Sequence, residues 1–562
     1  MFLRSKHRGL LVLGAIFFVL LTCMPQAGAK RKKVVEPQKI IFIPHDNRPI
    51  SDKQTAEVVK KLGYNVVVPP DDMLGSRDNL GNPDALWQWL RENAPGAEAA
   101  VVSSDSMLYG SLVGSRKHEY TKEQISQRTA EFDNFHKEFP KLKMYAFGSI
   151  MRTPRNGEAS GHEEPEYYRS YGADIFRYTV LKDKQEVKGL TKREQKEYNF
   201  LTKLIPANAL QDWQERRAKN YDASVQLINM VRKGDFKYFV LGRDDNAPFS
   251  ATHMESRHLA EVGKDLGKTQ FQAMAGIDEM GMLMLTRAVN DMRREMPFIF
   301  VRYNWGRGES TIPSYSDESI GQSIADAVVA AGGMMVPNPA KADLVLCVNT
   351  NSNGKTYEAN MPENDGTPRK SDTSYFMDIV NEYVAAGYPV GIADIAFANG
   401  SDNALMEQLK SQGLLYKLRA YAGWNTATNS TGFVIGEGML VRHMTDAAVD
   451  DLLTTRYLDD WAYQANVRNI IARQLTWLRG DGVYGNLGTK YKSVAYRTST
   501  MMKRFVEDNL PPMSNLEEIE VSFPWNRMFE SDVQHGEHQE EDFSKLFHIP
   551  PEPGTETSNK HK

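Results

Sequence analysis

The chain has 562 residues, of which 68 are Lys or Arg and 72 are Asp or Glu, so its formal net charge is −4. A protein that binds nucleic acid mainly through phosphate contacts carries a clear basic excess, and this balance therefore argues against a nucleic-acid partner. Hydrophobic residues make up 41% and charged residues 25% of the sequence, which excludes a wholly disordered chain. The length predicts roughly two to four domains.

The first 29 residues have the pattern of a signal peptide. Basic residues precede an apolar run from Gly9 to Thr22, and small residues then fill the cleavage positions Ala27 to Ala29. The run is too short for a membrane span, which needs ~20 residues, but it fits a signal-peptide core. We therefore predict export, with residues 1–29 removed and no stable membrane span in the mature form. A less favoured alternative is a lipid anchor on Cys23.

From Lys39 onward, short apolar runs alternate with amphipathic helical segments. Runs that are apolar throughout are typical of strands buried on both faces of a parallel sheet. The fold class is therefore α/β. Ten such runs predict ten strands, at 40–43, 66–68, 99–102, 144–147, 238–241, 271–275, 298–301, 344–348, 390–393 and 418–422.

Ten strands exceed an eight-stranded barrel, and we predict two doubly wound, Rossmann-like lobes over residues 39–295 and 296–440, with six and four strands. A long helical stretch at about 164–233 indicates an inserted helical cap in the first lobe. A helical region that ends in a strand follows at 441–529, and residues 530–562 are expected to form an acidic, disordered tail. A decorated (β/α) barrel is the alternative, because a barrel would bring together the polar residues that follow the strands.

Polar residues follow almost every predicted strand, at the carboxyl edge where parallel sheets bind ligands. A single Asp or Asn there is often a helix cap, because its side chain accepts hydrogen bonds from free N–H groups. Caps do not account for the arginines and aromatic rings at the same ends, and the whole collection suits a sugar or another small-molecule polyol. The residues that we expect to bind such a substrate are Asp46, Asn47, Arg48, Asp105, Tyr109, Arg152, Arg302, Asn304, Asp394, Trp424 and Asn425.

Acid-catalysed glycoside cleavage needs two carboxyl groups, one to protonate the leaving oxygen and one to act as nucleophile or base. The acidic doublets after the fifth and sixth strands supply the candidates. We expect Asp278 or Glu279 to protonate the leaving group and Asp244 or Asp245 to act as base or nucleophile, with Trp424 stacked on the sugar ring. Because neighbouring side chains of an extended chain point to opposite faces, one member of the Asp244–Asp245 doublet is expected to face the site while the other caps a helix.

Several stretches of the chain, in their order along the sequence, resemble segments of one bacterial family. They are 44–49, 69–75, 104–116, 242–249, 276–285 and 420–433, with 523–530 as a closing segment. In these stretches the chain resembles the domain-of-unknown-function family 4127 (DUF4127), and the resemblance covers most of the chain from Lys39 to Glu530. It implies no catalytic residue, because the activity of that family is not established.

The sequence contains no G-x-x-x-x-G-K-[ST] phosphate loop, no complete dinucleotide loop, no G-x-S-x-G elbow and no H-E-x-x-H zinc helix, so we predict no cofactor. The leading hypothesis is an exported hydrolase that acts on carbohydrate, such as a glycoside or amino-sugar of the cell envelope. One alternative is a non-catalytic envelope protein whose two lobes close on a sugar. Another is a hydrolase that uses a hard divalent cation such as Mg²⁺ or Ca²⁺, with ligands from Asp46, Asp71, Asp105, Asp244 and Asp394.

Overall fold

The computed structural model describes residues 37–155, 163–367, 371–475, 482–511 and 518–535. Every helix and strand given below lies in one compact unit that begins at Gln38. The predicted signal peptide, Cys23 and residues 536–562 of the predicted tail lie outside the described residues. Within those ranges, the structure contains no helix that is both long and apolar enough to cross a membrane.

The first half of the chain forms a six-stranded sheet in which all neighbouring strands are parallel. In sheet order its strands are β2 (Asn65–Val67), β1 (Lys39–Ile43), β3 (Ala97–Ser103), β4 (Lys143–Ile150), β5 (Tyr238–Arg243) and β6 (Phe271–Ala275). Successive side chains point to opposite faces, so Ile40 and Phe42 of β1 enter one apolar core while Ile41 and Ile43 enter another. Burial on both faces explains why these strands are apolar throughout, and the six predicted strands are confirmed.

The second half of the chain forms a five-stranded sheet, also parallel throughout. In sheet order its strands are β13 (Ala420–Ala422), β11 (Val390–Asp394), β9 (Leu344–Asn349), β7 (Phe298–Tyr303) and β8 (Met334–Met335). Four of these match predicted apolar runs, and β8 is an addition. Both residues of β8 are exposed, so no buried apolar run marks this strand in the sequence.

The two sheets have the same winding. In the first sheet, β2 lies on one side of β1 and the later strands lie on the other side; in the second sheet, β8 and the later strands are placed in the same way around β7. The connections therefore change direction between β1 and β3 and between β7 and β9. Such a switch point opens a crevice at the carboxyl ends of the strands, where doubly wound proteins bind ligands. Both sheets are open, with β2 and β6 at the edges of the first and β13 and β8 at the edges of the second. The barrel alternative is therefore wrong.

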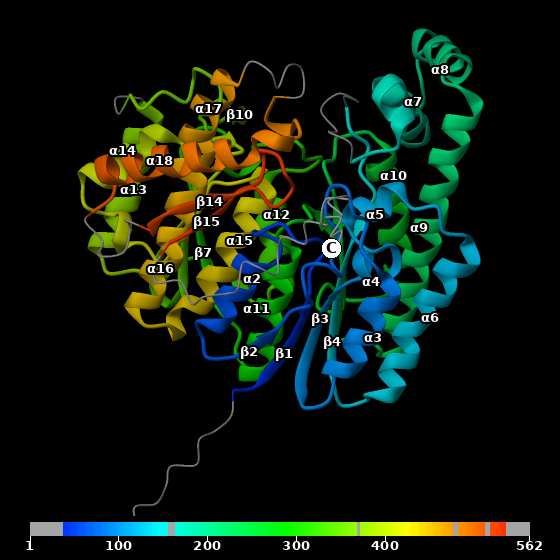
Figure 1. The fold of residues 1–562 in the computed structure, drawn as a ribbon, viewed down its shortest axis with the longest axis horizontal. Helices are drawn as coiled ribbons and strands as arrows, with labels where there is room; N and C mark the ends of the chain where they lie inside the picture. The colour runs from blue at the N-terminus through cyan, green and yellow to red at the C-terminus, as the bar shows by residue number, and fades with distance from the viewer. Residues whose placement is uncertain (1–36, 156–162, 368–370, 476–481, 512–517, 536–562) are drawn as a thin grey trace, which may run out of the picture. The chain divides into compact units, whose positions relative to one another are not determined.

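Helices cover both faces of each sheet (Figure 1). Those of the first half are α2 (Lys53–Lys60), α3 (Pro83–Asn93), α4 (Ser104–Tyr109), α5 (Leu112–Lys117), α6 (Lys122–Glu138), α7 (Glu166–Lys188), α8 (Lys192–Leu204), α9 (Ala207–Lys233), α10 (Ala251–Val262) and α11 (Met280–Arg293). Those of the second half are α12 (Ile320–Ala330), α13 (Ser371–Ala385), α14 (Asn403–Ser411), α15 (Ala427–Leu440), α16 (Asp446–Arg456), a π-helix (Tyr457–Val467), α17 (Arg468–Gln474) and α18 (Tyr491–Asn509).

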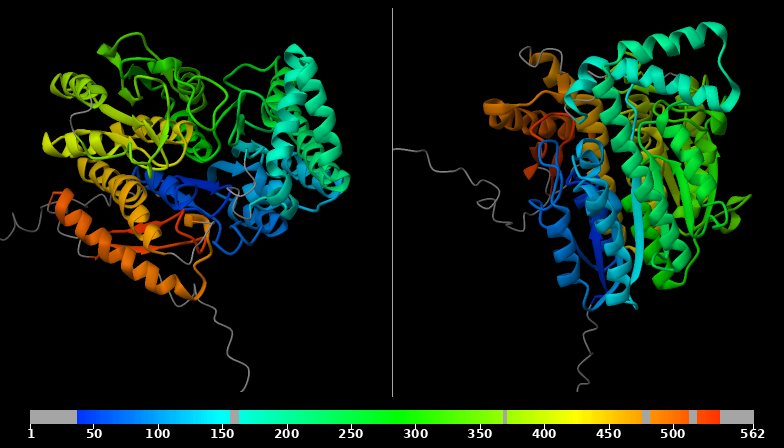
Figure 2. Two further views of the ribbon diagram at one scale, coloured as in Figure 1. Left: turned by 90° about the horizontal axis from the view of Figure 1, so that it is seen from above. Right: turned by 90° about the vertical axis from the view of Figure 1, so that its right-hand side faces the viewer.

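Two small sheets complete the described structure. The strands β10 (Tyr357–Glu358) and β12 (Phe397–Ala398) are parallel, whereas β14 (Glu520–Ser522) and β15 (Asp532–Gln534) are antiparallel. Figure 2 shows α18, in orange, beside these last two strands, in red. The strand β15 lies in the stretch predicted to be a disordered tail, so the ordered chain continues past Glu530.

Three helices, α7 to α9, lie between β4 and β5, in the stretch predicted to be a helical insertion. The last of them, α9, packs against α6 and β5, as the crossover helix of a parallel strand pair does. The other two pack against each other, and Figure 1 shows them at the top of the view. The added element is therefore the α7–α8 pair. The lobe boundaries at 295 and 440 stay predictions, because both sheets belong to the same compact unit.

Two helices, α11 and α15, join the sheets through a shared core. The helix α11 packs on β3 and β4, α15 packs on β11 and β13, and the two helices contact each other. Glycines in α15 allow this approach: a Cβ atom on Gly432 would lie 2.3 Å from Cγ of Glu279, and one on Gly436 would lie 2.7 Å from Cγ of Met282. The surrounding apolar cluster contains side chains from both sheets. A common core thus fixes the sheets to each other.

The glycine contact predicts that Gly432→Ala destabilises the protein. The new methyl group would overlap the Glu279 side chain, and overpacking of this kind costs about 1–3 kcal/mol of unfolding free energy. Urea denaturation measures the change. The control is Gly267→Ala, at an exposed position where a Cβ atom meets no neighbour closer than 3.6 Å. Equal stability of the two variants would show that the helices do not depend on this close approach.

Candidate active site

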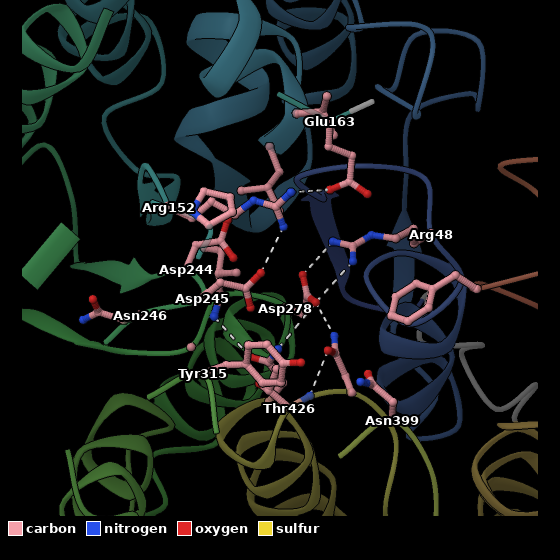
Figure 3. Close-up of a pocket in the computed structure, with 18 of the residues that line it drawn as sticks. Arg48, Arg152, Glu163, Asp244, Asp245, Asn246, Asp278, Tyr315, Asn399 and Thr426 are labelled. Carbon is pink, nitrogen blue, oxygen red and sulfur yellow. Dashed lines mark hydrogen bonds and ion pairs between the residues drawn. The ribbon is translucent and has the colours of Figure 1, made fainter. Parts of the chain in front are cut away.

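A cavity of about 370 Å³ lies at the carboxyl edge of the first sheet (Figure 3). One wall comes from the loops after β1, β4, β5 and β6, and another comes from the loops after β7, β12 and β13. The segment 525–530 near the C-terminus supplies further lining residues. The charged side chains that line the cavity are Arg48, Arg116, Arg152, Arg155, Glu163, Arg243, Asp244, Asp245, Asp278, Arg527 and Glu530.

A bidentate ion pair joins Arg48 and Asp278. Nη2 of Arg48 donates to Asp278 Oδ1 at 2.6 Å and Nη1 donates to Oδ2 at 3.2 Å, while Nε donates to Asp46 Oδ2 at 2.9 Å. Arg48 follows β1 and Asp278 follows β6, at opposite ends of a run of five strands. They meet because α11, which begins just after Asp278, runs back over β3 and β4.

The surroundings of Asp278 stabilise its ionised form. Nε2 of His45 lies 3.2 Å from Oδ1, and Nδ2 of Asn425 donates to Oδ2. Burial alone would raise the pKa of Asp278, but the charge of Arg48 and the hydrogen bond to His45 outweigh it and hold the pKa well below its ordinary value. Asp278 is therefore a carboxylate throughout the physiological pH range.

Both members of the Asp244–Asp245 doublet line the cavity, whereas the sequence predicts that only one does. Asp245 has a φ of +35°, so the backbone leaves the extended conformation in which neighbouring side chains diverge. Each carboxylate is held by an arginine: Nη2 of Arg116 donates to Asp244 at 2.5 Å, and Nη1 of Arg152 donates to Asp245 at 3.0 Å. Burial and the charge of Asp244 nevertheless raise the pKa of Asp245 to about 6.

Three arginines meet at Glu163, whose carboxylate lines the same cavity. The donors are Nη1 of Arg116 at 2.8 Å, Nη2 of Arg152 at 3.1 Å and Nη2 of Arg527 at 2.8 Å. Burial opposes ionisation, but these three charges hold the pKa of Glu163 well below its ordinary value. Figure 3 shows Arg152 and Glu163 on the same side of the cavity. Arg116 and Arg152 thus connect Glu163 to the acidic doublet.

Left-handed backbone conformations gather at the cavity. Among the described residues other than glycine, six have a positive φ, and four of these line the cavity: Asp245 (35°), Tyr315 (64°), Asn399 (62°) and Asn425 (81°). Such conformations cost free energy, and they persist where the surrounding structure imposes them, which is common at functional sites. The cavity is thus the part of the described fold in which backbone strain is concentrated.

Distant parts of the chain position the remaining wall. Asp460 in the π-helix accepts a hydrogen bond from the N–H of Gly423 at 2.8 Å, which orients the loop that carries Asn425. Nε1 of Trp525 donates to Asn47 Oδ1 at 2.8 Å and so docks the C-terminal segment beside β1. Arg527, two residues later, reaches Glu163. Residues 47 and 525–527, which are far apart in the sequence, therefore meet at this site.

Of the fifteen residues predicted for the site, six line the cavity: Arg48, Arg152, Asp244, Asp245, Asp278 and Asn425. Asp46 and Asn47 lie directly behind it, as the partners of Arg48 and Trp525. Glu279 and Trp424 are also behind the lining. Trp424 is only 4% exposed, because Phe529 packs edge-on against it with ring centroids 5.1 Å apart.

The other predicted residues lie elsewhere. Asp105 and Tyr109 are buried below the cavity, where Asp105 accepts the N–H of Ser149 at 2.8 Å and Tyr109 stacks on His118 with ring centroids 4.8 Å apart. Three residues lie in strands of the second sheet or directly after one, and do not line the cavity. They are Arg302, which is exposed, Asn304, which donates to the carbonyl of Thr350, and Asp394, which accepts the hydroxyl of Tyr421.

Sequence reasoning missed several lining residues. Arg116 and Arg527 fall in stretches 104–116 and 523–530, on which the family resemblance rests, so the resemblance is the signal that could have found them. Glu163 and Tyr315 follow no predicted strand directly, and no motif marks either of them.

The five acids suggested as ligands of a divalent cation are not brought together. Asp46 pairs with Arg48, Asp244 pairs with Arg116, and Asp105 and Asp394 have the partners given above. Asp71 is exposed, with Lys53 as its nearest cation at 3.9 Å. Among the residues that the structure describes, no three His, Cys, Asp or Glu side chains form a group that could hold a metal ion.

A family model described as "Protein of unknown function (DUF4127)" matches residues 40–534, which is nearly all of the chain. The chain belongs to this family. A search of the curated proteins gives no match. The DUF4127 match contains both sheets, the helical insertion and the C-terminal segment, so every lining residue described above falls within the region that the family model covers.

In this DUF4127 chain, the two members of the Asp278–Glu279 doublet lie in different environments. Asp278 faces the cavity, whereas Glu279 is 2% exposed and its Oε2 has no hydrogen-bond partner in the described structure. Burial raises the pKa of Glu279 to about 8. The native state therefore keeps a proton that the unfolded chain releases at the ordinary value of 4.5, and this contribution to stability is lost as the pH rises from 4.5 to about 8.

We expect Glu279→Gln to remove this pH dependence. The gain in unfolding free energy of the variant over the wild type grows between pH 5 and pH 8, by at most about 1.4 kcal/mol per pH unit. Urea denaturation at both pH values measures it, and Glu98→Gln, at an exposed position, is the control. A difference between Glu279→Gln and wild type that does not change with pH would mean that Glu279 is ionised in the native state.

Proposed function

We propose that the protein is an exported hydrolase that cleaves a glycosidic bond in a carbohydrate of the cell envelope. The observation that carries the proposal is a pair of carboxyl groups in one cavity whose environments separate their pKa values. Asp278 is held ionised by Arg48, whereas the pKa of Asp245 is raised to about 6. Separated values of this kind assign an acid and a base in glycoside hydrolysis.

The roles follow from the direction of each pKa shift. Asp245 carries the proton and donates it to the leaving oxygen, and Asp278 acts as the base or nucleophile. This assignment exchanges the roles that the sequence suggests for the two doublets. Asp244 acts on Asp245 rather than on the substrate, because its charge favours the protonated form of its neighbour.

The polar lining supports a carbohydrate as the substrate. Asn246, Asn399, Asn425 and Thr426 add amide and hydroxyl groups beside the charged side chains, and a sugar offers hydroxyls that both donate to and accept from such groups. The shared core favours an enzyme over a binding protein that closes by hinge motion, because α11 and α15 fix one sheet against the other. The location in the envelope rests on the predicted signal peptide.

The proposal predicts that Asp245→Asn and Asp278→Asn each lower kcat/KM by at least about 100-fold, since each removes a group that transfers a proton or forms a bond to the substrate. Hydrolysis of envelope glycans and of chromogenic glycosides measures the effect. Asp71→Asn is the matched control, because Asp71 also follows a strand but lies outside the cavity. Full activity of both cavity variants would contradict the proposal, and activity that depends on an added divalent cation would favour the metal-dependent alternative.

The pH profile provides a separate prediction. Asp245 must be protonated to act as the acid, so kcat/KM of the wild type falls as the pH rises above about 6. Asp244→Asn removes a charge that raises the pKa of Asp245, and the falling limb therefore moves to lower pH. A limb that stays in place in Asp244→Asn would show that another group supplies the proton.

A further inference from the structure

Tyr315 is an unusual residue in the cavity lining. It lies in the loop between β7 and α12, its φ is +64°, and it is 40% exposed. A left-handed backbone is rare for a bulky aromatic residue, because the side chain crowds the following carbonyl group. An exposed ring at a strained position contributes little to the core, so its conformation requires another explanation.

Two hydrogen bonds hold Tyr315 in this position. The backbone N–H of Asn246, next to the acidic doublet, donates to the carbonyl of Tyr315 at 3.0 Å. The hydroxyl of Tyr315 donates to Glu358 at 3.0 Å, and Nδ2 of Asn399 donates to the other oxygen of the same carboxylate at 2.9 Å. Figure 3 shows Tyr315 on the side of the cavity opposite to Arg152 and Glu163. The ring is thus fixed before any ligand arrives.

The other aromatic rings of the cavity lining are already covered. The guanidinium groups of Arg48 and Arg527 pack on the ring of Trp525, at 5.3 Å and 4.9 Å from its centre. Phe529 and Tyr484 stack on each other with ring centroids 4.5 Å apart. Among the described residues, the ring–ring and cation–ring contacts at the cavity involve Trp525, Tyr484 and Phe529 but not Tyr315.

We propose that Tyr315 is the stacking platform of the site, and that it binds a pyranose ring whose C–H groups form one apolar face. This inference rests on the proposed function and specifies its substrate class. It assigns to Tyr315 the role that the sequence suggests for the buried Trp424. The carboxyl groups of Asp245 and Asp278 then act on a sugar ring whose orientation the tyrosine sets, and the strained backbone is what places the ring there.

Three variants distinguish the effect of the aromatic ring on binding from the effect of the strained backbone on stability. Tyr315→Gly removes the ring and adopts a positive φ without cost, whereas Tyr315→Phe keeps the ring and loses only the hydrogen bond to Glu358. As a control, Tyr496→Ala removes an exposed ring that does not line the cavity. Glucose and N-acetylglucosamine oligomers serve as pyranose probes, and sorbitol serves as a polyol without a ring face. Calorimetric titration gives the dissociation constants, and thermal denaturation gives the stability.

We expect Tyr315→Gly to weaken pyranose binding roughly tenfold without a lower unfolding temperature, Tyr315→Phe to bind within about threefold of wild type, and Tyr496→Ala to match it. Unchanged binding in Tyr315→Gly, equal binding of sorbitol and pyranoses, or no pyranose binding by the wild type would each overturn the inference. Turnover that is unaffected by Tyr315→Gly overturns the stacking role and leaves the hydrolase intact. Pyranose binding that depends on Tyr315 but occurs without any turnover would support the stacking role and contradict the hydrolase proposal.

Discussion

The ion pair between Arg48 and Asp278 is the interaction on which the candidate site depends. It links the loop after β1 to the start of α11, and it fixes the ionisation of the carboxylate that faces the cavity. A buried ion pair brings little net stability, because desolvation offsets the attraction, but loss of one partner leaves an uncompensated buried charge. The main role of the ion pair is therefore to keep Asp278 ionised and in position, rather than to stabilise the fold. Asp46, on the far side of Arg48, orients the guanidinium for this purpose.

Residues with unusual backbone conformations surround this ion pair, and a tightly packed helix contact lies behind it. Four residues with a positive φ, in loops that follow strands of both halves of the chain, line the cavity, and this backbone conformation is sparsely populated for residues other than glycine. Behind the cavity, α11 and α15 share a core, and Gly432 lets the two helices approach each other closely. Asp245 and Tyr315 then face the same cavity from opposite sheets.

Much of the fold and less of the site follows from the sequence. The strands of the two large sheets are buried and apolar throughout, so local composition is enough to predict each of them except β8, whose two residues are exposed. The two-residue strands β10 and β12 of the small parallel sheet are too short to form an apolar run. The tendency of parallel sheets to bind ligands at the carboxyl ends of their strands identifies the correct edge of the first sheet. The direction of each side chain, however, depends on backbone dihedrals and on contacts that are remote in sequence. Asp245 lines the cavity together with Asp244 and has a positive φ, whereas Glu279 lies behind the lining, in the contact between α11 and α15. Trp424 is covered by Phe529, which lies about a hundred residues later in the chain and could not be assigned to this site from local pattern.

The central claim is that Asp278 and Asp245 share a cavity but differ in protonation. A carboxyl ¹³C NMR titration of aspartate-labelled protein tests it most directly, with Asp278→Asn and Asp245→Asn used to assign the two signals. We expect the Asp245 signal to titrate near pH 6 and the Asp278 signal to remain that of a carboxylate down to pH 4. Two signals that titrate together near the ordinary aspartate value of about 4 would contradict it.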